Sequence, residues 1–157
     1  MTLSSFYGSA VLLVMSAGAA WSQTAMLTVQ EPTKLVVSRT ENPTHVLKVA
    51  MKPGFHTNSN KPTEDYLIPF KLTWDAGGPL EVAEIVFPAA KMEKYSFAEK
   101  PISVFGGEFE VVTKFKRAAN PALGPGFVTG KLRYQACNET TCFPPKTVAI
   151  KLPVLMQ

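Results

Sequence analysis

Apolar and polar residues alternate with a period of two along most of the chain beyond residue 22. In the segment 44–52, Leu47, Val49 and Met51 fall on one side of an extended chain and Lys48 falls on the other. Because successive side chains of a strand point to opposite faces, this alternation predicts strands with one buried face. The 3.6-residue period of an amphipathic helix is almost absent.

Nine segments with this pattern are predicted strands: 26–29, 34–39, 44–52, 68–74, 80–87, 102–105, 109–116, 127–134 and 147–152. The turn signal Gly106-Gly107 predicts a tight hairpin, and the Pro- and Gly-rich segment 121–126 predicts a longer loop. The segment 89–99 lacks a repeating apolar stripe and is interpreted as a loop. Nine short strands at this spacing predict an all-β fold, an immunoglobulin-like antiparallel β-sandwich.

The first 22 residues have the features of a secretory signal peptide. Residues 10–15 form a short apolar core, and Ala20 and Ser22 are the small residues expected before a cleavage site. The apolar run is too short to span a bilayer. An uncleaved N-terminal anchor is the alternative, because no Lys or Arg precedes the apolar run. We expect residues 23–157 to form one domain, periplasmic or otherwise exported, and soluble after cleavage of residues 1–22.

The charged residues all follow the predicted signal peptide, so the exported part carries the whole net charge of +4. In the sequence these charges are spread thinly, without a Lys/Arg block or an alternation of aromatic and basic residues. This distribution argues against a nucleic-acid partner.

Cys137 and Cys142 are the only cysteines, and four residues separate them. Export allows them to form a disulfide. In the chain-entropy model a loop of about 6 residues stabilises by roughly 2 kcal/mol, against roughly 4 kcal/mol for about 60 residues. A disulfide that closes so short a loop therefore adds little stability and is a reasonable candidate for a redox-active one. The spacing alone leaves the structural and the redox-active interpretation open.

The cysteine loop lacks the features that activate a thiolate. Thioredoxin-type sites place Cys-x-x-Cys at a helix N-terminus, whereas this loop has a longer spacing and no Lys, Arg or His. Glu139 inside the loop disfavours a thiolate. The pair is thus predicted to react with a partner's thiolate rather than to act as a strong catalyst. A zinc site with His45 and His56 is a minor alternative, because the zinc spacing is absent. We interpret His56 as a loop residue with local hydrogen bonds.

Several segments resemble one known family. Tyr134-Gln135-Ala136-Cys137 followed by Cys142-Phe143-Pro144-Pro145 resembles the redox-active segment of the N-terminal periplasmic domain of the thiol:disulfide interchange protein DsbD. Pro53-Gly54-Phe55-His56-Thr57-Asn58 and Tyr66-Leu67-Ile68-Pro69 are also similar to that domain, as is the order of strands. The resemblance covers about residues 28–153.

The resemblance implies roles for particular residues. Cys142 would form mixed disulfides with partners and Cys137 would resolve them, while Phe143 matches the aromatic residue that follows the second cysteine. The family has a cap loop with an aromatic residue over the disulfide, which here falls within residues 93–99. Phe97 is the first choice for that residue and Tyr95 the second; the alternative is that both pack against the sandwich edge. Glu93 or Glu99 could assist proton transfer.

The expected function is that of an exported thiol:disulfide oxidoreductase component that needs no metal or organic cofactor. The spacing of four residues departs from the five of the best-known members, so the loop is tighter. The chain also ends at Gln157 without the family's membrane section or its thioredoxin-like domain. We therefore expect its partners, thioredoxin-like proteins and a membrane electron carrier, on separate chains. The rival hypothesis is a binding or structural sandwich domain whose disulfide only pins a loop.

Overall fold

A computed structural model describes residues 25–157, and this part of the chain is all-β, which confirms the predicted fold class. Its strands are β1 (Leu27–Val29), β2 (Leu35–Val37), β3 (Thr44–Met51), β4 (His56–Asn58), β5 (Lys71–Trp74), β6 (Leu80–Val86), β7 (Lys91–Glu93), β8 (Ile102–Gly106), β9 (Glu108–Arg117), β10 (Gly124–Tyr134), β11 (Ala136–Cys137) and β12 (Lys146–Met156). The predicted signal peptide lies outside the described residues. Within 25–157 no helix is long and apolar enough to cross a membrane.

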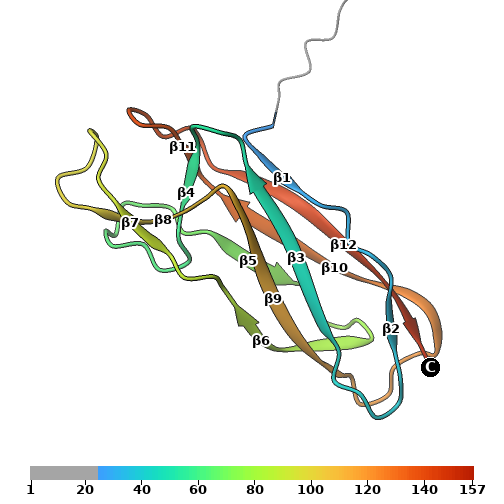
Figure 1. Ribbon diagram of the computed structural model, residues 1–157. Helices are drawn as coiled ribbons and strands as arrows, with labels where there is room; N and C mark the ends of the chain where they lie inside the picture. Colours follow the sequence, from blue (N-terminus) through green and yellow to red (C-terminus); the bar gives the residue numbers. More distant parts are fainter. Residues whose placement is uncertain (1–24) are drawn as a thin grey trace, which may run out of the picture.

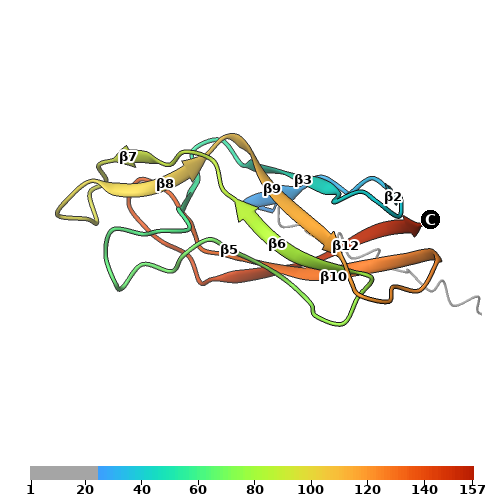
Figure 2. The same ribbon diagram turned by 90° about the horizontal axis from the view of Figure 1, so that it is seen from below.

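Two four-stranded sheets form the sandwich, and a third sheet extends it at one end (Figures 1 and 2). Sheet A has the order β1-β3-β9-β6, sheet B the order β2-β12-β10-β5, and sheet C the order β11-β4-β8-β7. All pairs are antiparallel except β12 with β2. In both views sheet C lies at the end of the sandwich away from the C-terminus.

The main core fills the space between sheets A and B. Alternate residues of the long strands point into it, among them Leu47 from β3, Phe115 from β9 and Leu132 from β10, each at most 1% exposed. Trp74 crosses the core: its Nε1 donates to Thr113 Oγ1 at 3.0 Å, and its ring meets Phe115 edge-on. Buried apolar area of this kind is the main stabilising contribution in such a domain.

Three predictions about local structure are wrong. The segment 89–99 is not entirely loop, because β7 lies within it. Gly106-Gly107 does not close a hairpin: β8 pairs in sheet C and β9 in sheet A, so the chain switches sheets there, with Gly107 at φ 65°. Part of the predicted loop 121–126 is strand, since β10 begins at Gly124. The cause is shared, because strand pairing across sheets, rather than local pattern, fixes these segments.

Candidate functional site

The two cysteines lie on the two arms of a small hairpin, joined by a disulfide with their Cα atoms 4.0 Å apart. Asn138 N donates to Thr141 O and Phe143 N donates to Ala136 O, both at 2.9 Å. These two bonds flank the cysteine pair, so Cys137 and Cys142 are directly opposite in a non-hydrogen-bonded position, where side chains approach most closely. Backbone pairing therefore holds the two sulfur atoms together independently of the covalent bond.

The turn of this hairpin is closed by an asparagine side chain. Asn138 Oδ1 accepts hydrogen bonds from the backbone N of Thr140 at 3.0 Å and of Thr141 at 2.8 Å. An asparagine that bonds to backbone groups two and three residues ahead stabilises a tight turn. The four-residue spacing thus has a structural explanation, since it is the length of this turn.

The cysteines differ sharply in exposure. Cys137 is fully buried in β11, whereas Cys142 is half-buried on the return arm. The aromatic residue after it, Phe143, is also half-buried and packs against Phe55 with ring centres 5.9 Å apart. A thiolate from another protein can therefore approach the sulfur of Cys142 more easily than that of Cys137.

His56 is the residue of sheet C directly opposite Cys137. β11 pairs with β4, with Cys137 facing His56 and Ala136 facing Thr57. Directly opposed residues have side chains on the same face of a sheet, so the imidazole and the disulfide share one face. Ala136 and Phe105 are on the other face and belong to the main core. The face that carries the disulfide is therefore turned away from the main core.

The cap segment, residues 93–99, covers this face. Tyr95 stacks on His56 with ring centres 3.9 Å apart, and Phe97 stacks on Tyr95 at 5.5 Å. The segment also reaches the cysteine hairpin, because Ser96 Oγ donates to Glu139 O at 2.9 Å. It folds on itself through Lys94 Nζ, which donates to the backbone oxygens of Ala98 and Glu99.

Both aromatic residues of the cap segment also belong to a second, smaller core. Tyr95 and Phe97 are half-buried against a cluster formed by Leu67, Ala98, Ile102 and Val104. The packing alternative raised by the sequence therefore describes a real contact. The same two rings nevertheless reach the cross-strand neighbour of Cys137, and Tyr95, rather than Phe97, makes the closer stack.

The electrostatics of the site disfavour a positive charge beside the disulfide. Burial lowers the pKa of His56, although the charge of Glu93 raises it in part. Its Nε2 is buried without a hydrogen-bond partner. Tyr95 donates its hydroxyl hydrogen to Glu93, and burial, then this hydrogen bond, then nearby carboxylate charges raise the pKa of Tyr95. At neutral pH His56 is uncharged, and no imidazolium stabilises a thiolate on Cys137.

The sequence interpretation of His56 is wrong. The residue lies in strand β4 rather than in a loop, it is 5% exposed, and its Nε2 has no local hydrogen bond. Strand β4 was not predicted because His56, Thr57 and Asn58 are polar, and because all three are buried without alternation.

Glu93 and Glu99 were the two candidates for assisting proton transfer. Glu99 is exposed, and Glu93 accepts a hydrogen bond from the Tyr95 hydroxyl.

The zinc alternative receives no support from the arrangement. His45 lies in β3 and packs edge-on against Trp74, while His56 lies in sheet C, and both cysteines are bonded to each other. Among residues 25–157 no group of three His, Cys, Asp or Glu side chains is placed to hold a metal ion.

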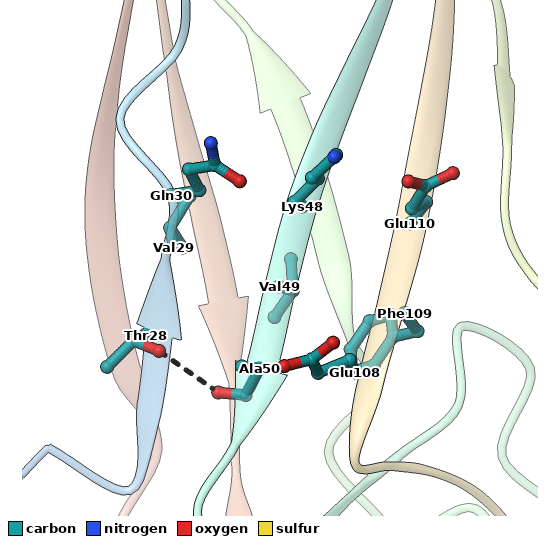
Figure 3. A pocket seen from close by; sticks show the side chains of 9 residues that line it. All are labelled: Thr28, Val29, Gln30, Lys48, Val49, Ala50, Glu108, Phe109 and Glu110. Carbon is teal, nitrogen blue, oxygen red and sulfur yellow. Dashed lines mark hydrogen bonds between the residues drawn. The ribbon is translucent and has the colours of Figure 1, made fainter.

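Two hollows of the surface bear on a binding role. One of about 320 Å³ adjoins the cap, lined in part by His56, Tyr95 and Glu139. Another, of about 700 Å³, lies on sheet A over β1, β3 and β9, and neither cysteine lines it (Figure 3). Its charged residues are Lys48, Glu108 and Glu110, and neither a cysteine nor a histidine lines it.

Comparisons with known proteins found a matching family model and several similar solved structures. The family described as "Thiol:disulfide interchange protein DsbD, N-terminal" matches residues 23–153. Similar solved structures include the N-terminal domain of DsbD from Neisseria meningitidis in its reduced form, at 18% identity and a TM-score of 0.46, covering 68% of this chain and 74% of that one. No curated protein matches the chain.

A second solved structure is the N-terminal periplasmic domain of ScsB from Proteus mirabilis. It is 15% identical with a TM-score of 0.50, and the match covers 80% of this chain and 44% of that one. The chain therefore spans less than half of the ScsB structure. At this identity the likeness concerns the fold alone.

Proposed function

The chain belongs to the family of DsbD N-terminal domains, and we propose that it is an exported thiol:disulfide exchange protein that relays electrons through Cys137 and Cys142. Domains of this family are periplasmic, and the same compartment is proposed here. The proposal describes an oxidoreductase component whose substrates are the disulfides and dithiols of other proteins. It requires neither a metal nor an organic cofactor.

The observation that carries the proposal is the asymmetric pair on its hairpin. One cysteine is half-buried and the other fully buried, yet the two residues are directly opposite in the backbone pairing. Such a pair can open at one sulfur while the other stays within reach. A disulfide that only pinned a loop would gain nothing from this difference in access.

The proposed exchange moves two electrons and two protons. A donor thiolate attacks Cys142 Sγ, the bond between the two cysteines breaks, and Cys137 leaves as a thiolate that takes up a proton. The donor's second thiol then releases Cys142 as a thiol and leaves the donor oxidised. In the second half, Cys142 as thiolate attacks the disulfide of an acceptor protein, and Cys137 resolves the mixed disulfide with loss of its proton.

The donors and acceptors are proposed to be thioredoxin-like proteins and a membrane electron carrier on separate chains. A low-pKa thiolate on such a partner would supply the reactivity that this hairpin lacks, because no imidazolium faces Cys137 and the loop contains Glu139. The partner is thus the nucleophile in the first step.

The cap segment is proposed to limit access to the disulfide. An aromatic pair contributes about 0.5–1.5 kcal/mol beyond its area, so Tyr95→Ala or Phe97→Ala should raise the open population of the cap roughly 2- to 10-fold. Reduction of the disulfide by dithiothreitol should accelerate by the same factor. Tyr66→Ala is the matched control, because Tyr66 is 64% exposed on another loop. If the disulfide were reduced at the same rate in Tyr95→Ala, Phe97→Ala and Tyr66→Ala, the cap segment would not limit access to it.

The reduction potential of the disulfide tests the proposed function. After equilibration with glutathione buffers, we expect a reduction potential well above about −300 mV. Structural disulfides that resist reduction have potentials below that value. The reduced protein should also return its electrons to an oxidised thioredoxin-like protein. A reduction potential below that value, with no electron transfer to the thioredoxin-like protein, would support the loop-pinning alternative.

A further inference from the structure

The outer face of sheet B gathers four cations into one patch, here called the basic face: Lys71 in β5, Lys131 and Arg133 in β10, and Lys151 in β12. All four side chains are exposed. The strand register makes them neighbours, because Arg133 lies opposite Lys71 and Lys151 lies opposite Thr129, two residues from Lys131. Charges that are separated in the sequence thus lie on one surface.

The basic face is nearly free of carboxylates. Within residues 25–157 the ion pairs join Lys114 to Glu84 and Lys116 to Glu81, both on sheet A. The four strands of sheet B contain no Asp or Glu, and Asp75, just beyond β5, accepts a hydrogen bond from Thr129 Oγ1 at 2.6 Å. Four cations therefore face solvent on strands that carry no carboxylate of their own.

The outer face of sheet A has the opposite balance. It carries Lys48, Lys114 and Lys116 together with Glu81, Glu84, Glu108 and Glu110. Figure 2 shows the two large sheets as separate layers of the sandwich. The molecule is electrically asymmetric across its thickness, so an anionic surface attracts the face of sheet B and repels that of sheet A.

We propose that the basic face is a docking surface for anionic phospholipid headgroups. Neighbouring cations lie about 5 Å apart across the strands and about 7 Å apart along them, which suits a continuous negative surface. Phe127, 53% exposed, lies on the same face with Lys151 Nζ 3.9 Å from its ring centre. An exposed aromatic residue beside cations is typical of groups that lie at the headgroup level.

A flat bilayer fits this face better than an acidic protein does. A tight protein interface needs pockets that receive anchoring side chains, and the hollows described above lie on other parts of the surface. The docked orientation also has a consequence for the site, since β10 runs directly through Gln135 into β11. The cysteine hairpin would remain close to the bilayer plane. This inference stands independently of the redox proposal.

Vesicle sedimentation tests the basic face. The purified protein is mixed with vesicles of phosphatidylcholine alone or of phosphatidylcholine with phosphatidylglycerol, at low and at high salt. Each Lys or Arg near an anionic surface strengthens binding about fivefold, so Lys131→Gln with Arg133→Gln should weaken binding to the anionic vesicles about 25-fold. Lys48→Gln with Lys114→Gln removes the same charge from sheet A and should leave binding nearly unchanged. All variants share the same N-terminal segment, so their difference reports the sheet faces.

The expected result is binding that requires phosphatidylglycerol, falls with salt, and depends on the sheet B variant alone. Equal weakening by both double variants would overturn the proposal, because net charge rather than an oriented face would then explain binding. Binding that is indifferent to phosphatidylglycerol would overturn it too. Binding to soluble polyglutamate but not to the vesicles would assign the face to an acidic protein partner instead.

Discussion

Replacement of Cys142 by serine is expected to reduce disulfide exchange with a thioredoxin-like partner by roughly 100-fold or more, whereas Cys137→Ser should trap that partner in a stable mixed disulfide. The remaining thiol in Cys142→Ser is fully buried and needs local opening of the hairpin before it can react. An opening that costs about 3 kcal/mol gives a factor of roughly 100, since each 1.4 kcal/mol is tenfold. In Cys137→Ser the Cys142 thiolate still attacks the partner's disulfide, and with a partner variant that lacks its own second thiol no group resolves the product.

Non-reducing electrophoresis with mass spectrometry measures the adducts, and stopped-flow kinetics measures the rates. The double variant Cys137→Ser with Cys142→Ser is the control and should form no adduct. If Cys142→Ser trapped the partner as quickly as Cys137→Ser, the proposed order of attack would be wrong, although the exchange function itself could stand. Adducts recovered from cell extracts would in addition identify the electron donor.

The two large sheets were predictable because each has one face in the core and one in solvent. In β3, Leu47, Val49 and Met51 are buried and the residues between them are more exposed, so burial reproduces the alternation of the sequence. The long strands β9, β10 and β12 follow the same rule over most of their length. A sheet with one buried and one solvated face produces this alternation of apolar and polar residues in the sequence.

Of the four strands of sheet C only β8 was predicted, as the segment 102–105. The others, β4, β7 and β11, were not predictable by the same reasoning, since they are short and lack the alternation. β4 is buried on both faces, between the main core on one side and the cap segment on the other. β7 is exposed throughout, and β11 has only two residues. These strands exist because distant segments pair with them, and this information is not present in any local window of sequence.

The candidate site was accessible from the sequence only in part. The two cysteines and their aromatic flank stand in a recognisable motif, and the structure joins the cysteines in a disulfide. The neighbourhood of His56 and Cys137 depends on the register between β4 and β11, which lie far apart in the chain. The basic face was not predicted from the sequence for the same reason. Its cations come from β5, β10 and β12 and become neighbours only through strand pairing.

Phe70→Ala should destabilise the domain by about 3–5 kcal/mol, the usual cost of emptying a buried phenylalanine site. Phe70 is 1% exposed and meets the rings of Phe87, Phe105 and Phe109 edge-on, with centres 5.5–6.2 Å apart. These rings come from sheet A, sheet C and the chain after β6. The loss is therefore expected at the junction between the sandwich and the sheet that carries the cysteines.

Urea unfolding followed by tryptophan fluorescence measures this change, with Phe127→Ala as the matched control. Phe127 is 53% exposed, and its contact with Lys151 is an exposed cation–π pair of about 0.5–1 kcal/mol. Domains of this size have about 5–15 kcal/mol of stability in total, so Phe70→Ala should shift the midpoint far more than the control. Equal shifts would contradict the packing described here. Because Phe105 belongs to β8, which pairs with β4, a loosened junction should also speed reduction of the disulfide in Phe70→Ala, below its unfolding transition.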